Sequence, residues 1–112
     1  MIAITNATLI SYTTPAVPDA RGGKAAGSTT AYPAGTLACV DQPRVSQLTS
    51  LANKVAGVTA VIYMPIVGTI GLGGRITYRL DGNPTPRTVE VLHWIERSHD
   101  DQSHFEVYVK GA

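Results

Sequence analysis

The sequence is poor in charge and nearly free of cysteine, and each shortage excludes a class of protein. Only 15% of its 112 residues are charged, against ~25% in a typical globular chain, and the formal net charge is +1. So small a net charge does not keep a chain disordered, and no basic surplus indicates tight binding to nucleic acid. The single cysteine, Cys39, rules out an intramolecular disulfide and a zinc site built on several cysteines.

Long apolar runs are missing as well. No stretch approaches the ~20 apolar residues of a membrane span, and no basic region precedes an apolar one near the N-terminus, so we expect neither a membrane anchor nor a signal peptide. A small neutral domain more often covers part of its surface with a partner, because the cores of protein interfaces are depleted in charged residues.

Motifs that would carry catalysis or bind a cofactor are weak. A predicted turn and its flanks contain residues that could bind a metal, although the same residue types are common in solvated turns. These possible ligands are His93, His99, Asp100, Asp101 and His104. The glycine-rich segment 66–74 is unusually apolar for a loop and carries no charge. It leads into an alternating strand, whereas a phosphate-binding loop would lead into a helix. We therefore predict that the protein is not an enzyme and holds no metal or cofactor.

Most of the chain has the pattern of β-strands. Residues 75–80 alternate cleanly, with Ile76, Tyr78 and Leu80 predicted to point inward. Apolar and alternating runs predict strands at 2–12, 37–42, 58–64, 75–80, 88–97 and 105–110.

One segment has the pattern of a helix. Asp41 or Gln42 can cap it, Pro43 suits its first turn, and apolar residues recur at spacings of three and four between Val45 and Val55. Its polar face carries a single charge, on Lys54. The pattern predicts a short helix over 43–56.

The segment 13–36 is different again, because 19 of its 24 residues are Ala, Gly, Ser, Thr or Pro. Such a segment buries little apolar area to offset the entropy of ordering it. We predict a long flexible loop here, which is either a passive connection or a segment that orders against a partner. Together, these elements predict a mainly β single domain over 1–112: a small antiparallel β-barrel or sandwich with one short inserted α-helix and a long loop between its first two strands.

The order of these elements and four short motifs carry a resemblance to a known family. The motifs are Val-Ile-Tyr-Met-Pro at 61–65, Gly-Gly-Arg-Ile-Thr-Tyr-Arg-Leu-Asp-Gly at 73–82, Val-Glu-Val-Leu-His-Trp-Ile-Glu-Arg at 89–97 and Phe-Glu-Val-Tyr-Val-Lys at 105–110. In this arrangement the chain resembles the head-closure, or stopper, proteins that join head to tail in tailed bacteriophages.

The resemblance implies a structural component of the virion neck, assembled in the host cytoplasm. Such proteins form a ring, commonly a hexamer, that joins the portal and its adaptor to the tail and provides or closes a channel for double-stranded DNA without reading its sequence. On this hypothesis Arg21 and Lys24 are candidates for facing the channel. Candidates for contacting a neighbouring subunit or the adaptor are Tyr32, Ser46, Gln47, Ser50, Asn53 and Lys54.

Two alternatives stay open. A tail terminator or another tail-tube component shares the structural class but has other neighbours in the virion. An oligonucleotide-binding barrel would use Arg75 and Arg79 on one outward face, with Tyr63 and Trp94 for stacking, although the pattern places these two aromatic residues more readily in the core.

Overall fold

The structure is a computed structural model of the chain, and it describes residues 5–15, 17–18, 22–25, 27–42, 57–68, 70–97 and 103–111. These residues contain no helix, and hence none that could cross a membrane. They form nine strands: β1 (Ala7–Thr13), β2 (Val17–Pro18), β3 (Lys24–Ala25), β4 (Thr29–Ala31), β5 (Leu37–Asp41), β6 (Ala60–Met64), β7 (Arg75–Leu80), β8 (Arg87–Arg97) and β9 (His104–Gly111).

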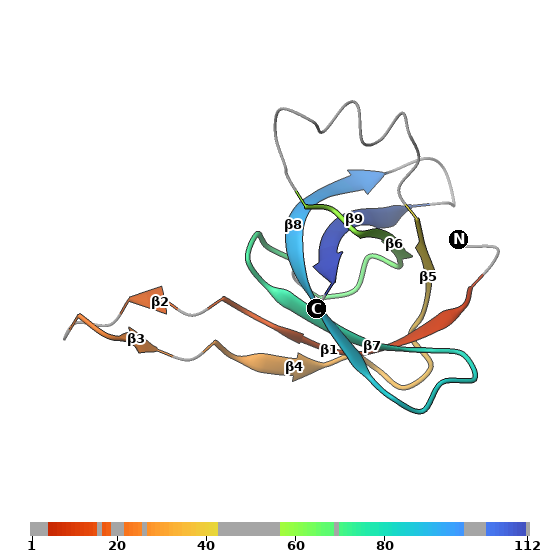
Figure 1. The fold of residues 1–112 in the computed structure, drawn as a ribbon, viewed down its shortest axis with the longest axis horizontal. Helices are drawn as coiled ribbons and strands as arrows, with labels where there is room; N and C mark the ends of the chain where they lie inside the picture. Colours follow the sequence, from red (N-terminus) through yellow and green to blue (C-terminus); the bar gives the residue numbers. More distant parts are fainter. Residues whose placement is uncertain are drawn as a thin grey trace.

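Six of these strands close into an antiparallel barrel (Figure 1). Around the barrel the order is β1, β5, β6, β9, β8 and β7, and β7 returns to pair with β1 from Ala7↔Leu80 to Thr13↔Arg75. Closure removes the exposed edges that an open sheet would leave. The mainly β fold is thus confirmed, and of the two predicted alternatives, a barrel or a sandwich, the structure shows the barrel.

The alternation of side chains fills the barrel. In β7, Ile76 and Tyr78 are buried and Arg75 and Arg79 are exposed, as the pattern predicted. A barrel of six strands is narrower than an eight-stranded one, whose interior just accommodates side chains, so the centre is a packed core. The main core includes Leu9, Tyr12, Ile62, Met64, Ile76, Tyr78, Val89, Val91, Phe105, Val107 and Val109.

One part of the barrel is also covered on its outer face. Val61 and Tyr108 form a second cluster there, with Val58, Tyr63 and Ile95 packed against it. In the alternating pattern of 105–110, Glu106 and Tyr108 lie on the face opposite to Phe105, Val107 and Val109. Both are nevertheless buried. Strands β6 and β9 therefore bury side chains on both of their faces.

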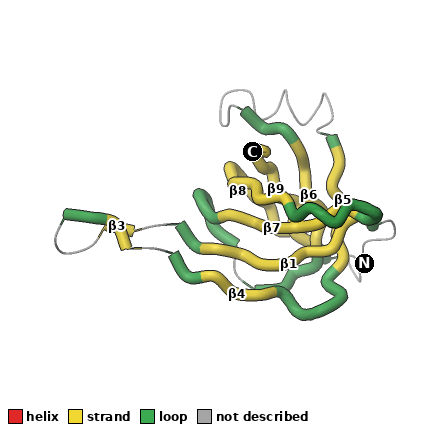
Figure 2. Tube along the Cα trace, turned by 60° about the horizontal axis from the view of Figure 1, so that its bottom comes forward, coloured by secondary structure: helices red, strands yellow, loops and turns green. Residues whose placement is uncertain are grey.

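The segment 13–36 departs from the prediction of a loop without secondary structure. Its described residues form a hairpin arm, defined here as Thr13–Ala31, in which β4 pairs with the end of β1 and β2 pairs with β3 (Figures 1 and 2). The arm lies along the longest dimension of the molecule, 47 Å. Composition misled here because β1, which pairs with β7 along its whole length, offers its other edge to β4 at Ser11–Thr13, and backbone pairing with a strand already held in place needs no apolar side chains.

The predicted helix lies outside the described residues. The described chain leaves β5 at Gln42 and resumes at Gly57, before β6. Segment 43–56 thus connects two neighbouring strands of the barrel, and its helical conformation stays a prediction.

Candidate functional site

The hairpin arm is joined at its root by backbone and hydroxyl groups. The Thr14 amide donates to the Ser28 carbonyl at 3.0 Å, and the Ser28 amide donates to the Thr14 hydroxyl oxygen at 2.8 Å. The Thr13 and Thr29 hydroxyls lie 2.9 Å apart. A Cβ at position 27 would overlap the Thr14 carbonyl, so only glycine fits between the two strands there. The sequence therefore specifies a close two-stranded pairing at the root.

The arm offers an uncharged and exposed strand. All three residues of β4 are exposed, and within the described residues β4 pairs with β1 alone. No charged residue occurs from Ala25 through Val40. Natural edge strands usually carry charges, prolines or bulges that prevent pairing with another chain. The three residues of β4 carry none of these, so only the shortness of the strand limits pairing with a further chain.

The loop from β6 to β7 lies beside the root of the arm. The Tyr12 hydroxyl donates to the Gly71 carbonyl at 3.3 Å, and a Cβ at position 74 would overlap the Tyr12 ring. Two backbone hydrogen bonds with Val91 hold Gly73 and Gly74 against β8, at 2.9 and 2.8 Å. The described part of this loop is thereby anchored, yet Leu72 remains 61% exposed.

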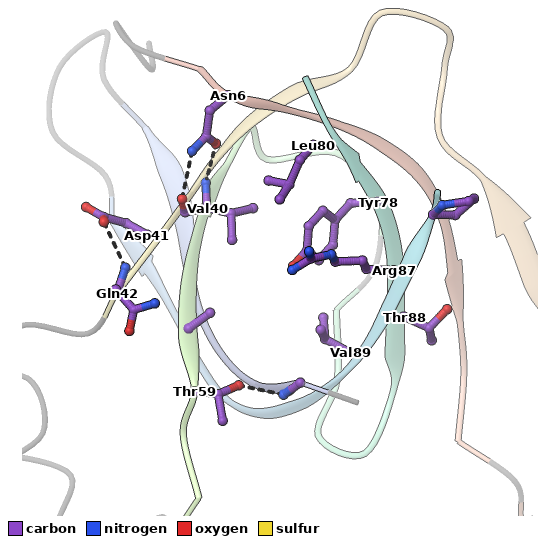
Figure 3. Close-up of a pocket in the computed structure, with 13 residues that line it drawn as sticks. Asn6, Val40, Asp41, Gln42, Thr59, Tyr78, Leu80, Arg87, Thr88 and Val89 are labelled. Atoms are coloured by element: carbon purple, nitrogen blue, oxygen red, sulfur yellow. Dashed lines mark hydrogen bonds between the residues drawn. The ribbon is translucent and has the colours of Figure 1, made fainter. Parts of the chain in front are cut away.

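The opposite end of the barrel opens into a cavity of about 600 Å³ (Figure 3). Leu80, Val40 and Val89 form apolar walls, and Tyr78 and Arg87 point into the opening. Asn6 closes one side, because its amide donates to the Val40 carbonyl at 2.9 Å and accepts from the Val40 amide at 2.8 Å. We call this opening the barrel mouth; its further lining residues are Asp41, Gln42, Thr59, Ala60, Pro86, Thr88 and Gly111.

A polar network lies on the outer face of the barrel. Glu106, which is 6% exposed, accepts from the Arg97 guanidinium at 3.0 Å and from the Tyr108 hydroxyl. The hydrogen bond and the charge of Glu106 raise the pKa of Arg97. The His93 ring lies 5.8 Å from that of Tyr108. This network fixes the register of β8 against β9.

The residues proposed for assembly are divided between the described chain and the rest. Tyr32 directly follows β4, packs against the main core and has a hydroxyl that no hydrogen bond reaches. Burial, and secondarily the nearby Tyr12, raise the pKa of Tyr32 to about 12. Lys24 begins β3 in the outer part of the arm. The remaining candidates lie outside the described residues: Arg21, Ser46, Gln47, Ser50, Asn53 and Lys54.

The residues considered for other chemistry are also placed in part. Of the possible metal ligands, His99, Asp100 and Asp101 lie outside the described residues, and within those residues no three potential ligands come together. Burial, followed by the charge of Asp41, raises the pKa of the Cys39 thiol, which disfavours the nucleophilic thiolate.

The side chains considered for stacking on nucleic-acid bases are engaged within the protein. Trp94 is half-buried and meets Phe105 edge to face, with the ring centroids 5.5 Å apart. Tyr63 packs against the outer cluster. Arg75 and Arg79 lie exposed on β7, and Arg75 pairs in register with the acidic Glu90. The arginines are thus exposed without an exposed aromatic surface beside them.

Comparisons with known proteins add no family. No family model matches the chain, and neither the comparison with curated proteins nor that with solved structures gives a significant match.

Two features escaped the reasoning from sequence. The barrel mouth escaped it because alternation predicts that Tyr78 and Leu80 point inward but not that the barrel is open at their end. The sequence of 66–74 lacks charge and is apolar, which could have indicated an exposed apolar side chain in this loop. It does not indicate that Gly73 and Gly74 are held against the barrel while Leu72 is exposed.

Proposed function

We propose that the protein is a non-enzymatic structural subunit of a bacteriophage neck, where copies form a ring, commonly a hexamer, between the portal adaptor and the tail. The observation that supports this most is the combination of a closed barrel with a hairpin arm that contributes little to the core and whose strand β4 is uncharged and exposed. A separate two-stranded ribbon is marginally stable in water. An arm of this kind is therefore best explained by a neighbour that covers it.

In the proposed ring, the arm lies against neighbouring subunits and its outer part, with Arg21 and Lys24, faces the channel. The polar face of the predicted helix contacts a neighbour or the adaptor through Ser46, Gln47, Ser50, Asn53 and Lys54, and Tyr32 is a further candidate for such a contact. Sparse basic charge suits a channel for DNA, because each neutralised phosphate adds affinity and would hold the genome back during ejection.

Imaging of the protein in its particle tests this proposal. We expect density for the chain at the single vertex where head meets tail, in the ring below the portal and its adaptor. Density for the chain throughout the capsid shell would contradict the proposal, and density in the tail tube or in the ring that caps it would indicate the tail-terminator or tail-tube alternative.

Limited proteolysis tests the role of the arm. We expect cleavage within 13–36 in the free protein and protection of the same bonds in assembled particles. Equal cleavage in both states would mean that the arm is a passive connection. Tight, salt-sensitive binding to single-stranded DNA, lost in the double variant Arg75→Ala with Arg79→Ala, would instead indicate an oligonucleotide-binding barrel.

A further inference from the structure

The outer surface of the barrel has two unlike sides. In the middle of β6 and β9 it carries the buried outer cluster, which includes Val61 and Tyr108. Across β7, which lies beside β1 in Figure 2, the outward side chains are hydrophilic instead. They are Arg75, Thr77 and Arg79, and both arginines are exposed.

Strands β8 and β9 extend this hydrophilic side with a row of charges. Arg75 pairs in register with Glu90 of β8, and Glu90 pairs in register with Lys110 of β9. Side chains directly opposite each other on neighbouring strands lie on the same face of a sheet. The row therefore carries two cations with one carboxylate between them, and all three residues are exposed. We call Arg75, Arg79, Glu90 and Lys110 the basic face.

The cations of the basic face are not neutralised by the part of the chain that the structure describes. The one ion pair formed there joins Arg97 to Glu106, so none of the three cations takes part in one. On the strands of this side, three cations thus outnumber a single carboxylate. An anion that approached this face would meet positive charge that is still free to bind it.

The spacing of the cations favours an extended polyanion over a small anion. Neighbouring strands lie ~4.8 Å apart, so Arg75 and Lys110, two strands apart, are separated by roughly 10 Å across the sheet. Arg79 lies four residues from Arg75 along β7, which corresponds to roughly 14 Å. Glu90 stands between Arg75 and Lys110 and would repel a single phosphate that approached both. A chain of phosphates can instead reach each cation separately.

We propose that the basic face contacts the sugar–phosphate backbone of double-stranded DNA, weakly and without reading its sequence. Arginine, lysine and threonine side chains commonly bind phosphate oxygens in this way. The Thr77 and Thr88 hydroxyls lie 3.0 Å apart on this face, and such a pair uses only one of its two protons internally, which leaves one to donate. The distance between Arg75 and Arg79 is also close to the width of the major groove, about 12 Å, across which two phosphate backbones face each other.

The lack of exposed apolar side chains on this face favours a duplex over other polyanionic surfaces. Among the described residues the exposed large apolar side chains are Leu37, Ile66 and Leu72, and none of them belongs to β7, β8 or β9. Proteins that bind single strands stack the bases on aromatic side chains, and segments that bind membrane surfaces insert apolar ones. A duplex keeps its bases stacked inside and presents its phosphates, so it needs neither.

This contact deepens the proposed neck function by naming the side of each subunit that faces the DNA. It rests on that function for the presence of DNA beside the protein and not for the arrangement of the charges. Glu90 suits a channel, because each phosphate that a protein neutralises adds affinity and would retard the moving genome.

Equilibrium binding of a short fluorescent duplex to the full chain at low salt tests the proposal. We expect Arg75→Gln to weaken binding by at least about threefold and to flatten the slope of log K against log salt by ~0.9, the value for one phosphate contact. The matched control is Arg87→Gln, which removes the same charge from an exposed arginine that points into the barrel mouth. We expect this control to leave both quantities unchanged.

A gain of affinity gives a second test that loss of folding cannot imitate. Glu90→Gln removes the carboxylate between Arg75 and Lys110, so we expect duplex binding to strengthen by about threefold. Glu96→Gln is its control, because it makes the same change at an exposed glutamate near the other end of β8. We expect binding by this control to equal that of the natural chain.

Four results would overturn the proposal. Equal effects of each variant and its control would mean that only the net charge matters, and absence of duplex binding by both the natural chain and Glu90→Gln would mean that the face holds no DNA. Tighter binding to a single strand of the same sequence would indicate an oligonucleotide-binding barrel. Binding to phosphatidylserine–phosphatidylcholine vesicles but not to the duplex would indicate a membrane surface as the partner.

Imaging of the particle separates this contact from the proposed function. Density at the neck, together with equal duplex binding by Arg75→Gln and Arg87→Gln, would support the function and contradict the basic face. The expected changes in duplex binding, together with density throughout the capsid shell, would support the contact and contradict the neck function.

Discussion

The barrel and the hairpin arm share strand β1 but are stabilised by different means. Inside the barrel β1 buries Leu9 and Tyr12 in a continuous core. In the arm the pairing is formed by backbone bonds and by hydroxyls such as those of Thr13 and Thr29, and β4 is exposed throughout. Because burial of apolar area is the dominant favourable term in folding, the barrel can fold by itself, and the arm depends on the barrel and on whatever covers it.

The largest expected effect is the loss of a core side chain. Ile62 is fully buried and pairs in register with Val40 on one side and Val107 on the other. We expect Ile62→Ala to lower the free energy of unfolding by about 2–5 kcal/mol, through lost apolar burial and the cavity left behind. Urea denaturation measures the change.

Thr29→Ala in the arm is the matched comparison for that core variant. It removes one exposed hydroxyl contact with Thr13, so we expect a change of no more than about 0.5 kcal/mol. A loss as large as that of Ile62→Ala would mean that the arm belongs to the same cooperative unit as the barrel.

A smaller loss is expected at the outer network of the barrel. Glu106→Ala removes the acceptor of Arg97 and Tyr108 on a buried surface. We expect a decrease of about 1–3 kcal/mol in the free energy of unfolding, the usual range when a buried polar group loses its partner. The control Glu90→Ala, at an exposed glutamate of β8, should change it by less than about 0.5 kcal/mol. Equal effects of the two variants would show that the network contributes no stability.

The junction between barrel and arm is expected to gain stability on substitution. The Tyr32 hydroxyl is buried and no hydrogen bond reaches it, so Tyr32→Phe should raise the free energy of unfolding by about 1 kcal/mol at neutral pH. Tyr12→Phe is the contrasting variant, because the Tyr12 hydroxyl donates to Gly71 and its loss should not stabilise.

Tyr32 also makes the stability depend on alkaline pH. Its pKa is raised from 10.0 in the unfolded chain to about 12 in the fold, so the folded state favours the protonated phenol. The contribution that this preference makes to the free energy of unfolding is fully present below pH 10 and is lost as the pH rises through about 12. Denaturation midpoints across this window should fall less steeply for Tyr32→Phe than for the natural chain. Parallel curves would mean that Tyr32 ionises equally in both states.

The barrel was predictable from the sequence and the arm was not, for a physical reason. The strand at 75–80 was predicted with its final bounds because inward-facing Ile76 and Tyr78 alternate with outward-facing arginines. That pattern arises because one face of the strand is buried. In the arm, backbone pairing specifies the strands Thr29–Ala31 and Val17–Pro18, and backbone pairing leaves no alternation of apolar and polar residues in the sequence.

The candidate surfaces were predictable to the same limited extent. The sparse charge of segment 13–36 and of the polar face of the predicted helix over 43–56 favoured surfaces that a partner covers. Neither stretch indicates which residues meet, because the barrel mouth is formed by residues far apart in the chain, such as Asn6, Val40 and Arg87. Such a surface exists only after the strands have closed.

The smallest change in global stability is expected where the arm alone is disturbed. A Cβ at position 27 would overlap the Thr14 carbonyl, so Gly27→Ala should separate the strands at the arm root. Because few apolar contacts are lost, the free energy of unfolding should change by no more than about 0.5 kcal/mol. Local opening is a separate quantity from global unfolding, and hydrogen exchange of individual amides reports it.

The Thr14 and Ser28 amides, which bond across the arm root, should lose their protection in Gly27→Ala, whereas the Val107 amide in the barrel should keep its own. Ser28→Ala is the control, since it leaves both backbone groups of residue 28 in place. Protection lost at Val107 as well would contradict the separation of arm and barrel. Protection lost in the arm alone would show that the arm opens independently of the barrel, although β4 is paired with a strand of that barrel.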